Sequence, residues 1–149
     1  MHSVASIKIA ERLNRQRPET LGPLNVLIQV NISDEETKSG VPPDAVLNLA
    51  PAIQALPNLK LRGLMTVPAH SDSLAAQRAP FRALRQLLEN VQAATGSSEI
   101  DQLSMGMTQD MEAAIAEGST MVRIGTAIFG ARIKSTTESL SPAGKDVIR

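Results

Sequence analysis

The chain has 149 residues, of which 42% are hydrophobic, and this length is sufficient to bury one core. The 15 basic and 15 acidic residues give a formal net charge of zero, so no long-range field would attract nucleic acid or an acidic membrane surface. No stretch approaches the ~18 consecutive apolar residues of a membrane span. We therefore expect neither nucleic acid nor a membrane as a partner.

Residue types that are rare or missing narrow the possible functions further. Cysteine is absent, which excludes disulfides, thiolate metal sites and a cysteine nucleophile, and makes the cytoplasm the expected location. The chain has 2 Phe and neither Trp nor Tyr, so no tyrosine can act as an acid or a base. His2 and His70 have no companions at metal-ligand spacing, and we expect both on the surface.

The first half of the chain alternates helical and strand patterns. Residues 6–17 carry apolar side chains at helical spacing and predict an amphipathic helix. Residues 24–32 are nearly continuous in apolar character and rich in β-branched residues, as in a strand buried on both faces of a parallel sheet. A loop over 33–43, a helix over 44–56 and a second strand over 59–67 follow.

Two prolines affect the expected helices. Pro51 lies inside the helix over 44–56 and predicts a kink or a late start, while Leu47 in the same helix is expected to face the core. Pro80 suits the first turn of the next helix, after a loop or loosely helical stretch over 69–79.

The last part of the chain holds two more strands. A short strand over 100–105 precedes a helix over 108–117, and a fourth strand over 120–124 leads into a helical turn at 127–130. Beyond Arg132 the pattern loses its periodicity.

The order of these elements predicts the fold class. Strands that alternate with helices through short loops indicate an α/β fold in which helices wrap a parallel sheet. Because no break in composition divides the chain, we expect one domain over residues 1–132 and a flexible tail over 133–149.

The polar residues at the carboxyl ends of the strands are the candidates for ligand binding, because ligands of parallel α/β folds bind there. Gln29 and Asn31 share one face near the end of the first strand, where they either satisfy each other or a buried water, or contact a ligand. Both readings remain open. Met65 near the end of the second strand is more typical of a core residue than of a ligand platform.

The third predicted strand ends in a turn that could bind an anion. Ser104 offers a hydroxyl, and Gly106 allows free backbone N–H groups at the start of a helix. Simple capping of that helix by Thr108 explains the same residues equally well.

The fourth predicted strand carries the sharpest signal. Arg123 stands in it with apolar neighbours on both sides, and a buried guanidinium cannot remain unpaired. Gly125 and Thr126 then open a short helical turn, the place where barrel enzymes frequently bind phosphate. Together with Ser104 and Gly106 on the neighbouring strand end, these residues predict a phosphate site.

These motifs resemble a known family. The segments 103–115 (LSMGMTQDMEAAI) and 118–132 (GSTMVRIGTAIFGAR) are closely similar to the end of the YggS/PROSC family of pyridoxal phosphate homeostasis proteins. Upstream, the segments 25–32 (NVLIQVNI), 38–40 (KSG) and 62–68 (RGLMTVP) match the same family in the same order. The likeness extends from the first residue to Arg132.

The resemblance implies a fold and a cofactor. The family is a single-domain barrel related to the N-terminal domain of alanine racemase, and it binds pyridoxal 5'-phosphate (PLP) without a well-established catalytic activity. This chain would form about the last four βα units of a (β/α)8 TIM-type barrel. By position, Ser104, Gly125 and Thr126 would hold the phosphate, Arg123 would face the pyridine nitrogen, and Met65 would line the ring pocket.

The chain also departs from the family pattern. The family's Schiff-base lysine ends the first barrel strand, which has no counterpart here, and none of the 5 lysines is expected at a strand end. Ala5 stands where relatives often have an acidic residue. The resemblance therefore implies weak, non-covalent binding of PLP.

Two other functions are compatible with the same fold. An amino-acid racemase or decarboxylase of the same fold type is not expected, because racemisation there uses the Schiff-base lysine and a tyrosine. An incomplete product without activity of its own is the other alternative. Half a barrel would have open sheet edges and an uncovered apolar face, which favours self-association.

Overall fold

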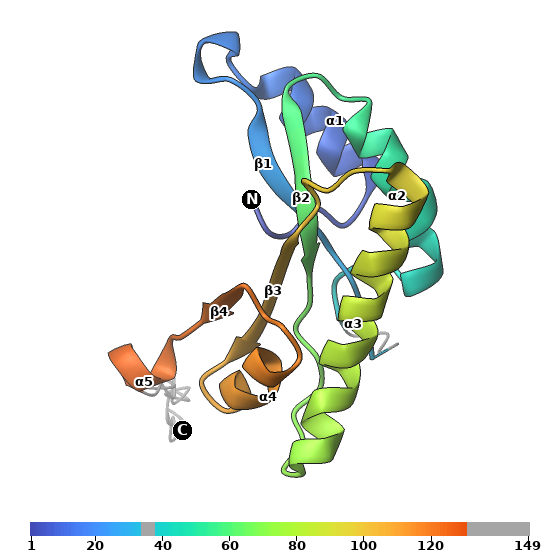
Figure 1. Ribbon diagram of the computed structural model, residues 1–149. Helices are drawn as coiled ribbons and strands as arrows, with labels where there is room; N and C mark the ends of the chain where they lie inside the picture. The colour runs from blue at the N-terminus through green and yellow to red at the C-terminus, as the bar shows by residue number, and fades with distance from the viewer. Residues whose placement is uncertain (34–37, 131–149) are drawn as a thin grey trace, which may run out of the picture.

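The computed structural model describes residues 1–33 and 38–130, so the predicted tail over 133–149 lies outside the described residues (Figure 1). The strands are β1 (Leu24–Gln29), β2 (Leu59–Met65), β3 (Gln102–Met107) and β4 (Met121–Arg123). The helices are α1 (Ile7–Gln16), α2 (Pro43–Gln54), α3 (Leu74–Thr95), α4 (Met111–Ala116) and α5 (Thr126–Phe129), with a 3-10 turn, η1, at Glu19–Leu21.

The strands form one parallel sheet in the order β1-β2-β3-β4, which confirms the predicted α/β arrangement. Val4 makes an isolated parallel bridge with Ile28, so the start of the chain continues the sheet beyond β1. The sheet is open at this edge and at β4 among the described residues.

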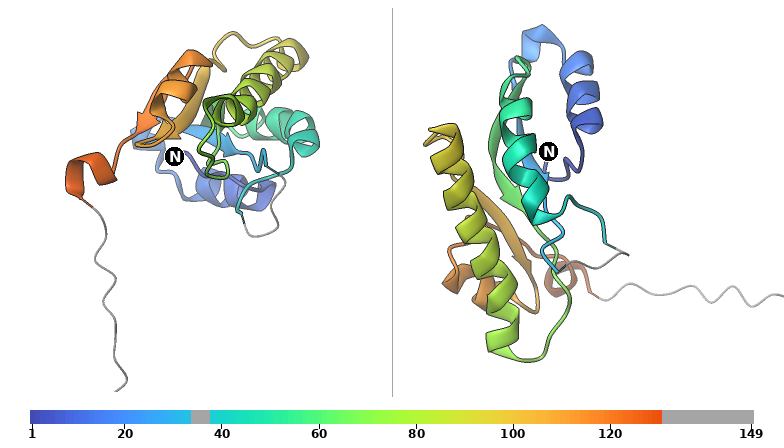
Figure 2. Two further views of the ribbon diagram at one scale, coloured as in Figure 1. Left: turned by 90° about the horizontal axis from the view of Figure 1, so that it is seen from below. Right: turned by 90° about the vertical axis from the view of Figure 1, so that its right-hand side faces the viewer.

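Helices α1 to α4 cover one side of the sheet (Figure 1 and Figure 2). The right-hand view of Figure 2 looks onto this layer, with α2 and α3 in front of the strands. The core lies between the two layers, where Val26 and Ile28 of β1 and Phe81 and Leu84 of α3 are fully buried. On the opposite side, which no helix of the described chain covers, Asn25 is exposed, whereas Leu27 beside the first residues of the chain is buried.

Pro51 lies inside its helix as predicted, without a late start, whereas Pro80 lies inside its helix and not in the first turn. Helix α2 runs past Pro51, whose carbonyl oxygen accepts a hydrogen bond from Ala55 N at 3.1 Å. Helix α3 begins at Leu74, six residues before Pro80, after Ser73 as N-cap. The prediction for Leu47 is wrong, because its side chain is 40% exposed while its neighbours in α2 face the core.

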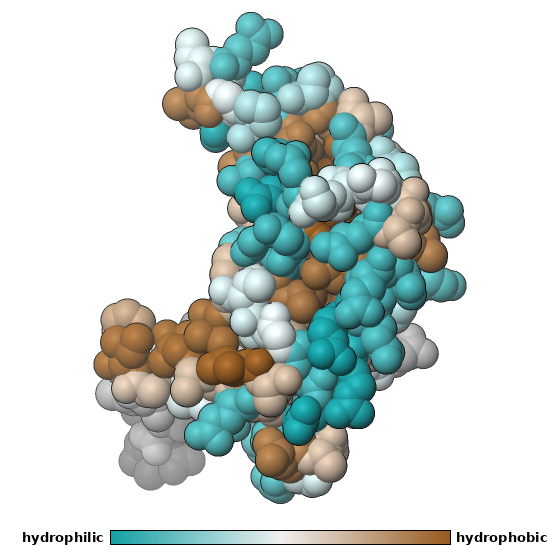
Figure 3. Space-filling view, in the orientation of Figure 1, coloured by the Kyte–Doolittle hydropathy of each residue, from teal (hydrophilic) through white to brown (hydrophobic). Residues whose placement is uncertain are grey.

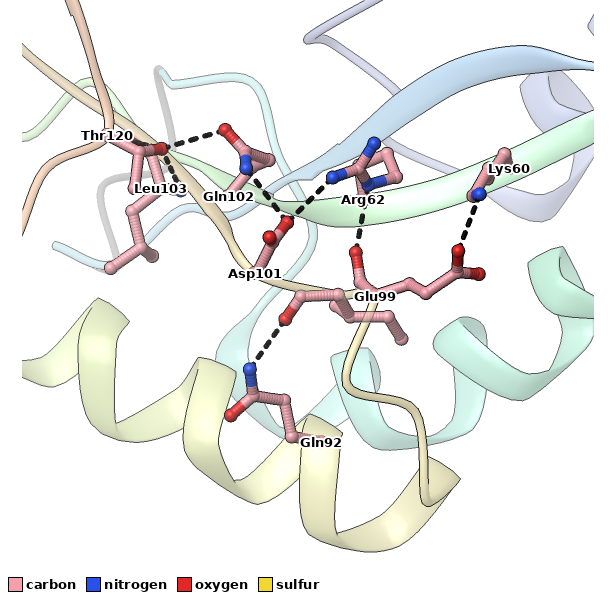
Figure 4. Close-up of polar contacts among 9 residues, drawn as sticks. Lys60, Arg62, Gln92, Glu99, Asp101, Gln102, Leu103 and Thr120 are labelled. Carbon is pink, nitrogen blue, oxygen red and sulfur yellow. Dashed lines mark hydrogen bonds and ion pairs between the residues drawn. The ribbon is translucent and has the colours of Figure 1, made fainter.

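A network of polar side chains joins the strands at their amino ends (Figure 4). Lys60 pairs with Glu99 at 2.7 Å, and Arg62 bonds Asp101 at 3.0 Å. Gln102 extends the network from Asp101 toward β4. Since these groups are largely exposed, the pairs contribute little stability individually and mainly fix neighbouring strand starts.

Exposed apolar side chains gather at the other end of the sheet, over β4 and α5 (Figure 3). Val122 is 38% exposed, Ile128 68% and Phe129 84%. We call these three residues the β4–α5 apolar patch. An apolar patch at an open sheet edge is a site where another polypeptide can pack.

A buried carboxylate fastens α4 to α3. Glu117, at the C-cap of α4, is 1% exposed. Its oxygens accept hydrogen bonds from Arg78 at 2.7 Å and Arg82 at 3.0 Å, and Arg85 lies at 3.7 Å. The hydrogen bond from Arg82 is the main cause that lowers the pKa of Glu117, against the opposing effect of burial. The three arginines lie on one face of α3.

Stability should depend on the charge of Glu117. The folded-state pKa of Glu117 lies below the ordinary value of 4.5. The charged carboxylate therefore stabilises the folded chain fully above pH 4.5, and this stabilisation is lost as the pH falls through the folded-state pKa. We expect wild type to have a higher free energy of unfolding in urea than Glu117→Gln at neutral pH. The difference between the two free energies should become smaller in acid. The control is Glu89→Gln, whose exposed carboxylate is 4.0 Å from Arg85. A difference in the free energy of unfolding that stays constant with pH would contradict this role of Glu117.

Candidate cofactor-binding site

A cavity of about 640 Å³ opens at the carboxyl ends of β2, β3 and β4. Its walls come from the segments that follow these strands and from α5. The lining residues are Pro68, His70, Met107, Thr108, Gln109, Asp110, Arg123, Gly125, Thr126, Phe129 and Gly130.

Arg123 ends β4 and is half-buried in the wall of this cavity. Its Nη1 donates to Ser104 Oγ at 2.7 Å, and its Nη2 donates to the Thr66 carbonyl oxygen at 2.8 Å. Burial lowers the pKa of Arg123 from its ordinary value, and Asp110 acts in the opposite direction. The side chain stays protonated at neutral pH, and its other N–H groups remain for a ligand.

Two hydroxyls stand side by side in the same cavity. Thr126 Oγ1 donates to Thr108 Oγ1 at 3.1 Å, which joins the segments after β3 and β4. Thr108 does not cap α4: the N-cap is Asp110, whose Oδ1 accepts from Met107 N at 2.6 Å. The capping reading of Thr108 is therefore wrong. The signal in the sequence that could have placed Thr108 in the cavity wall is its position directly after a strand end.

The predicted site residues divide into two groups. Arg123, Gly125 and Thr126 line the cavity. Ser104 and Met65 do not: they pair in register on β3 and β2, and both are buried. Ser104 is fully buried, and its hydroxyl oxygen accepts a hydrogen bond from Arg123.

Gly106 has a clear packing role. Its φ is +93°, and an added Cβ would lie 2.5 Å from the Cβ of Ala114 on α4. The missing side chain lets α4 approach β3 closely, which explains this glycine without a ligand.

The amide of Gln29, the last residue of β1, has a partner within the chain. Gln29 Nε2 donates to the Ser39 carbonyl oxygen at 3.0 Å. For Gln29 the structure favours internal satisfaction over ligand contact, since this bond fixes the loop beside β1.

The surface placement expected for His2 is wrong. The ring is half-buried, and its Nδ1 lies 3.1 Å from Ser104 Oγ. Burial, the Met1 amine and Arg123 lower the pKa of His2, in that order of importance. Sequence spacing could not reveal this contact, because the two residues are 102 positions apart.

Two kinds of site are absent from the described part of the chain. No group of three or more His, Cys, Asp or Glu could hold a metal ion among residues 1–33 and 38–130. Within the same ranges, no helix combines the length and apolar character needed to cross a membrane.

Comparison with known proteins identifies the family. The sequence profile of the alanine racemase N-terminal domain matches residues 1–133. The chain belongs to this family. A pyridoxal phosphate homeostasis protein of Haemophilus influenzae is 55% identical over 93% of this chain and 59% of its own length. This relative confirms the resemblance inferred from the motifs.

Solved structures support the fold of the family. PipY of Synechococcus elongatus, solved with PLP bound, matches with a TM-score of 0.76 and 31% identity, over 87% of this chain and 59% of PipY. A D-threonine aldolase of Filomicrobium marinum, at 18% identity and a TM-score of 0.66 over 83% of this chain and 35% of the aldolase, shares the fold alone. The expected partial barrel is confirmed, and the chain spans less than two thirds of the relatives it matches.

A pair of glycine substitutions tests the packing role of Gly106. We expect Gly106→Ala to destabilise the chain by ~1–3 kcal/mol, because the methyl group would meet Ala114 and the backbone φ is positive. Gly125→Ala should change the free energy of unfolding by less than ~0.5 kcal/mol, since no atom lies within 4 Å of its added Cβ. Urea unfolding measures both. Equal stability of the two variants would rule out the packing role of Gly106.

Proposed function

We propose that this chain binds PLP non-covalently and acts in PLP homeostasis. The observation that carries the proposal is the position of Arg123, fixed by two hydrogen bonds beside the paired hydroxyls of Thr108 and Thr126 in one cavity. The choice of ligand is supported by the similarity to the pyridoxal phosphate homeostasis protein of H. influenzae and to PipY, which was solved with PLP bound.

The donor set fits the chemistry of PLP. The hydroxyls of Thr108 and Thr126, with the adjacent backbone at Gly125, would hold the phosphate, and Arg123 would face the pyridine ring. Ser104 was expected on the phosphate. Because it is fully buried and bonded to Arg123, we propose that it acts through this arginine instead.

We propose a carrier rather than an enzyme. PLP supplies an electron sink when its ring nitrogen is protonated. A guanidinium beside that nitrogen would disfavour its protonation, because a second positive charge nearby is costly. Arg123 therefore suits retention of PLP better than catalysis. Turnover of an amino acid by the purified chain with added PLP would contradict this part of the proposal.

Affinity should be modest. Hydrogen bonds to charged groups contribute ~1.5–3 kcal/mol each, whereas association costs at least ~4 kcal/mol. Four such bonds less this cost leave ~2–8 kcal/mol, so the Kd is roughly micromolar at the strongest and weaker than millimolar at the weakest. The cytoplasmic location expected from the absence of cysteine stays a prediction.

Removing one cavity hydroxyl should weaken binding. We expect Thr126→Val to raise the Kd for PLP about tenfold, the equivalent of one charge-assisted hydrogen bond. Isothermal titration calorimetry measures the change. The matched control is Thr20→Val, an exposed residue of η1 outside the cavity, which should bind as wild type does. An equal rise of the Kd for PLP in both variants would contradict a cofactor site at Thr126.

The same samples test the mode of binding. After incubation with PLP and borohydride, the mass of the chain should stay unchanged, because a non-covalent ligand forms no reducible bond to a lysine. A stoichiometric adduct at one lysine would contradict non-covalent binding.

We also propose that the open sheet edge favours self-association through the β4–α5 apolar patch. Phe129 and Ile128 are its most exposed members, and burial of apolar surface stabilises association.

Phe129→Ser should therefore reduce the weight-average mass in static light scattering at high concentration, because it removes the largest side chain of the patch. The control is Leu21→Ser in η1, which is 61% exposed outside the patch. A monomeric wild-type chain at all concentrations would overturn this proposal.

A further inference from the structure

Ser104 links His2 to Arg123 in the interior of the sheet. Its Oγ accepts a hydrogen bond from Arg123 Nη1 at 2.7 Å and lies 3.1 Å from His2 Nδ1. A serine hydroxyl has one hydrogen to donate, and a guanidinium can only donate. Of the two contacts recorded for Ser104 Oγ among the described residues, only the one to His2 Nδ1 can take this hydrogen. The arrangement that satisfies all three groups therefore has the hydroxyl donating to Nδ1, with the proton of the neutral imidazole on Nε2.

The charged groups around His2 are cationic. The Met1 amine and Arg123 both lower its pKa, together with burial of the ring, which is the largest cause. Arg62 lines the same cavity of about 360 Å³ as His2, with its charge offset by Asp101. The other residues that line this cavity have uncharged side chains: Met1, Asn25, Leu27, Gln102 and Met121.

Protonation of His2 would disrupt this arrangement. A protonated Nδ1 would donate to Ser104 Oγ, which already accepts from Arg123, and the serine hydrogen would lose its acceptor. Since Ser104 is fully buried, water cannot replace that acceptor. Two cations would then share one oxygen atom, at a high electrostatic cost.

We propose that His2 is a positioning residue of the cofactor site. As the neutral Nε2–H tautomer it holds the Ser104 hydroxyl in the orientation that accepts from Arg123, and so fixes the guanidinium at the end of β4. The inference rests on the proposed function for its ligand, but the hydrogen-bond direction is a property of the chain alone. Protonation of His2 would loosen Arg123 and weaken binding of PLP in acid.

The ligand-free chain gives the first test. In 15N NMR spectra we expect His2 to show an unprotonated Nδ1 and a protonated Nε2, with a titration midpoint below 6.5. Ser104→Ala should raise this midpoint, because the bond that favours the neutral ring is lost. In the His70→Gln variant only the imidazole of His2 remains, so the remaining imidazole signals are those of His2. A proton on Nδ1, or a midpoint at or above 6.5, would overturn the inference whether or not the chain binds PLP.

Binding of PLP gives the second test. His2→Asn keeps an acceptor near the position of Nδ1 and does not titrate, whereas His2→Leu removes the acceptor. We expect His2→Leu to raise the Kd about two- to tenfold at neutral pH, the loss of one hydrogen bond. His2→Asn should bind as wild type does at neutral pH.

The pH profile separates positioning from simple packing. Relative to His2→Asn, wild type should lose affinity as pH falls through the His2 midpoint, since PLP itself titrates equally in both samples. Parallel profiles for the two proteins would overturn the positioning role. If no protein binds PLP, the proposed function fails, and the NMR result alone decides the inference.

Discussion

The hydrogen bonds of the Arg123 guanidinium determine how the end of the sheet is built. Arg123 lies on the shortest strand, yet its side chain reaches Ser104 on β3 and the carbonyl oxygen of Thr66 just after β2. A guanidinium that is half removed from water requires acceptors, and these two lie on neighbouring strands. The need to pair one cation therefore ties three strand ends together. The cavity exists where they meet.

Side chains also compensate for the short pairing between β3 and β4. Ser119 Oγ donates to the Met105 carbonyl oxygen at 2.7 Å, and Thr120 Oγ1 accepts from Leu103 N at 2.9 Å. Glu117 immediately before them is fixed by arginines of α3. The segment that leads into β4 is thus attached both to the sheet and to the helical layer. This double attachment explains how three strand residues can hold Arg123 in place.

Periodicity predicted the number, order and type of the main elements, because buried parallel strands and amphipathic helices leave strong local patterns. It misplaced the start of α3, since the good helix formers before Pro80 continue the helix in spite of that proline. In the site, Arg123 was found because a cation in an apolar strand needs partners. His2 was missed, since its contact with Ser104 spans 102 residues and leaves no local pattern.

The two exposed parts of the sheet differ in chemistry, and this changes what could cover them. An uncovered apolar face was expected on the side without helices, but the cavity there is lined by His2, Asn25, Arg62 and Gln102 as well as by apolar residues. Strong apolar exposure is instead found at the β4–α5 apolar patch. A covering segment would therefore need polar groups against the sheet face and apolar groups at its edge. Because buried polar groups without partners are costly, the match at the face would govern specificity in such an interface, while the edge would supply most of the hydrophobic stabilisation.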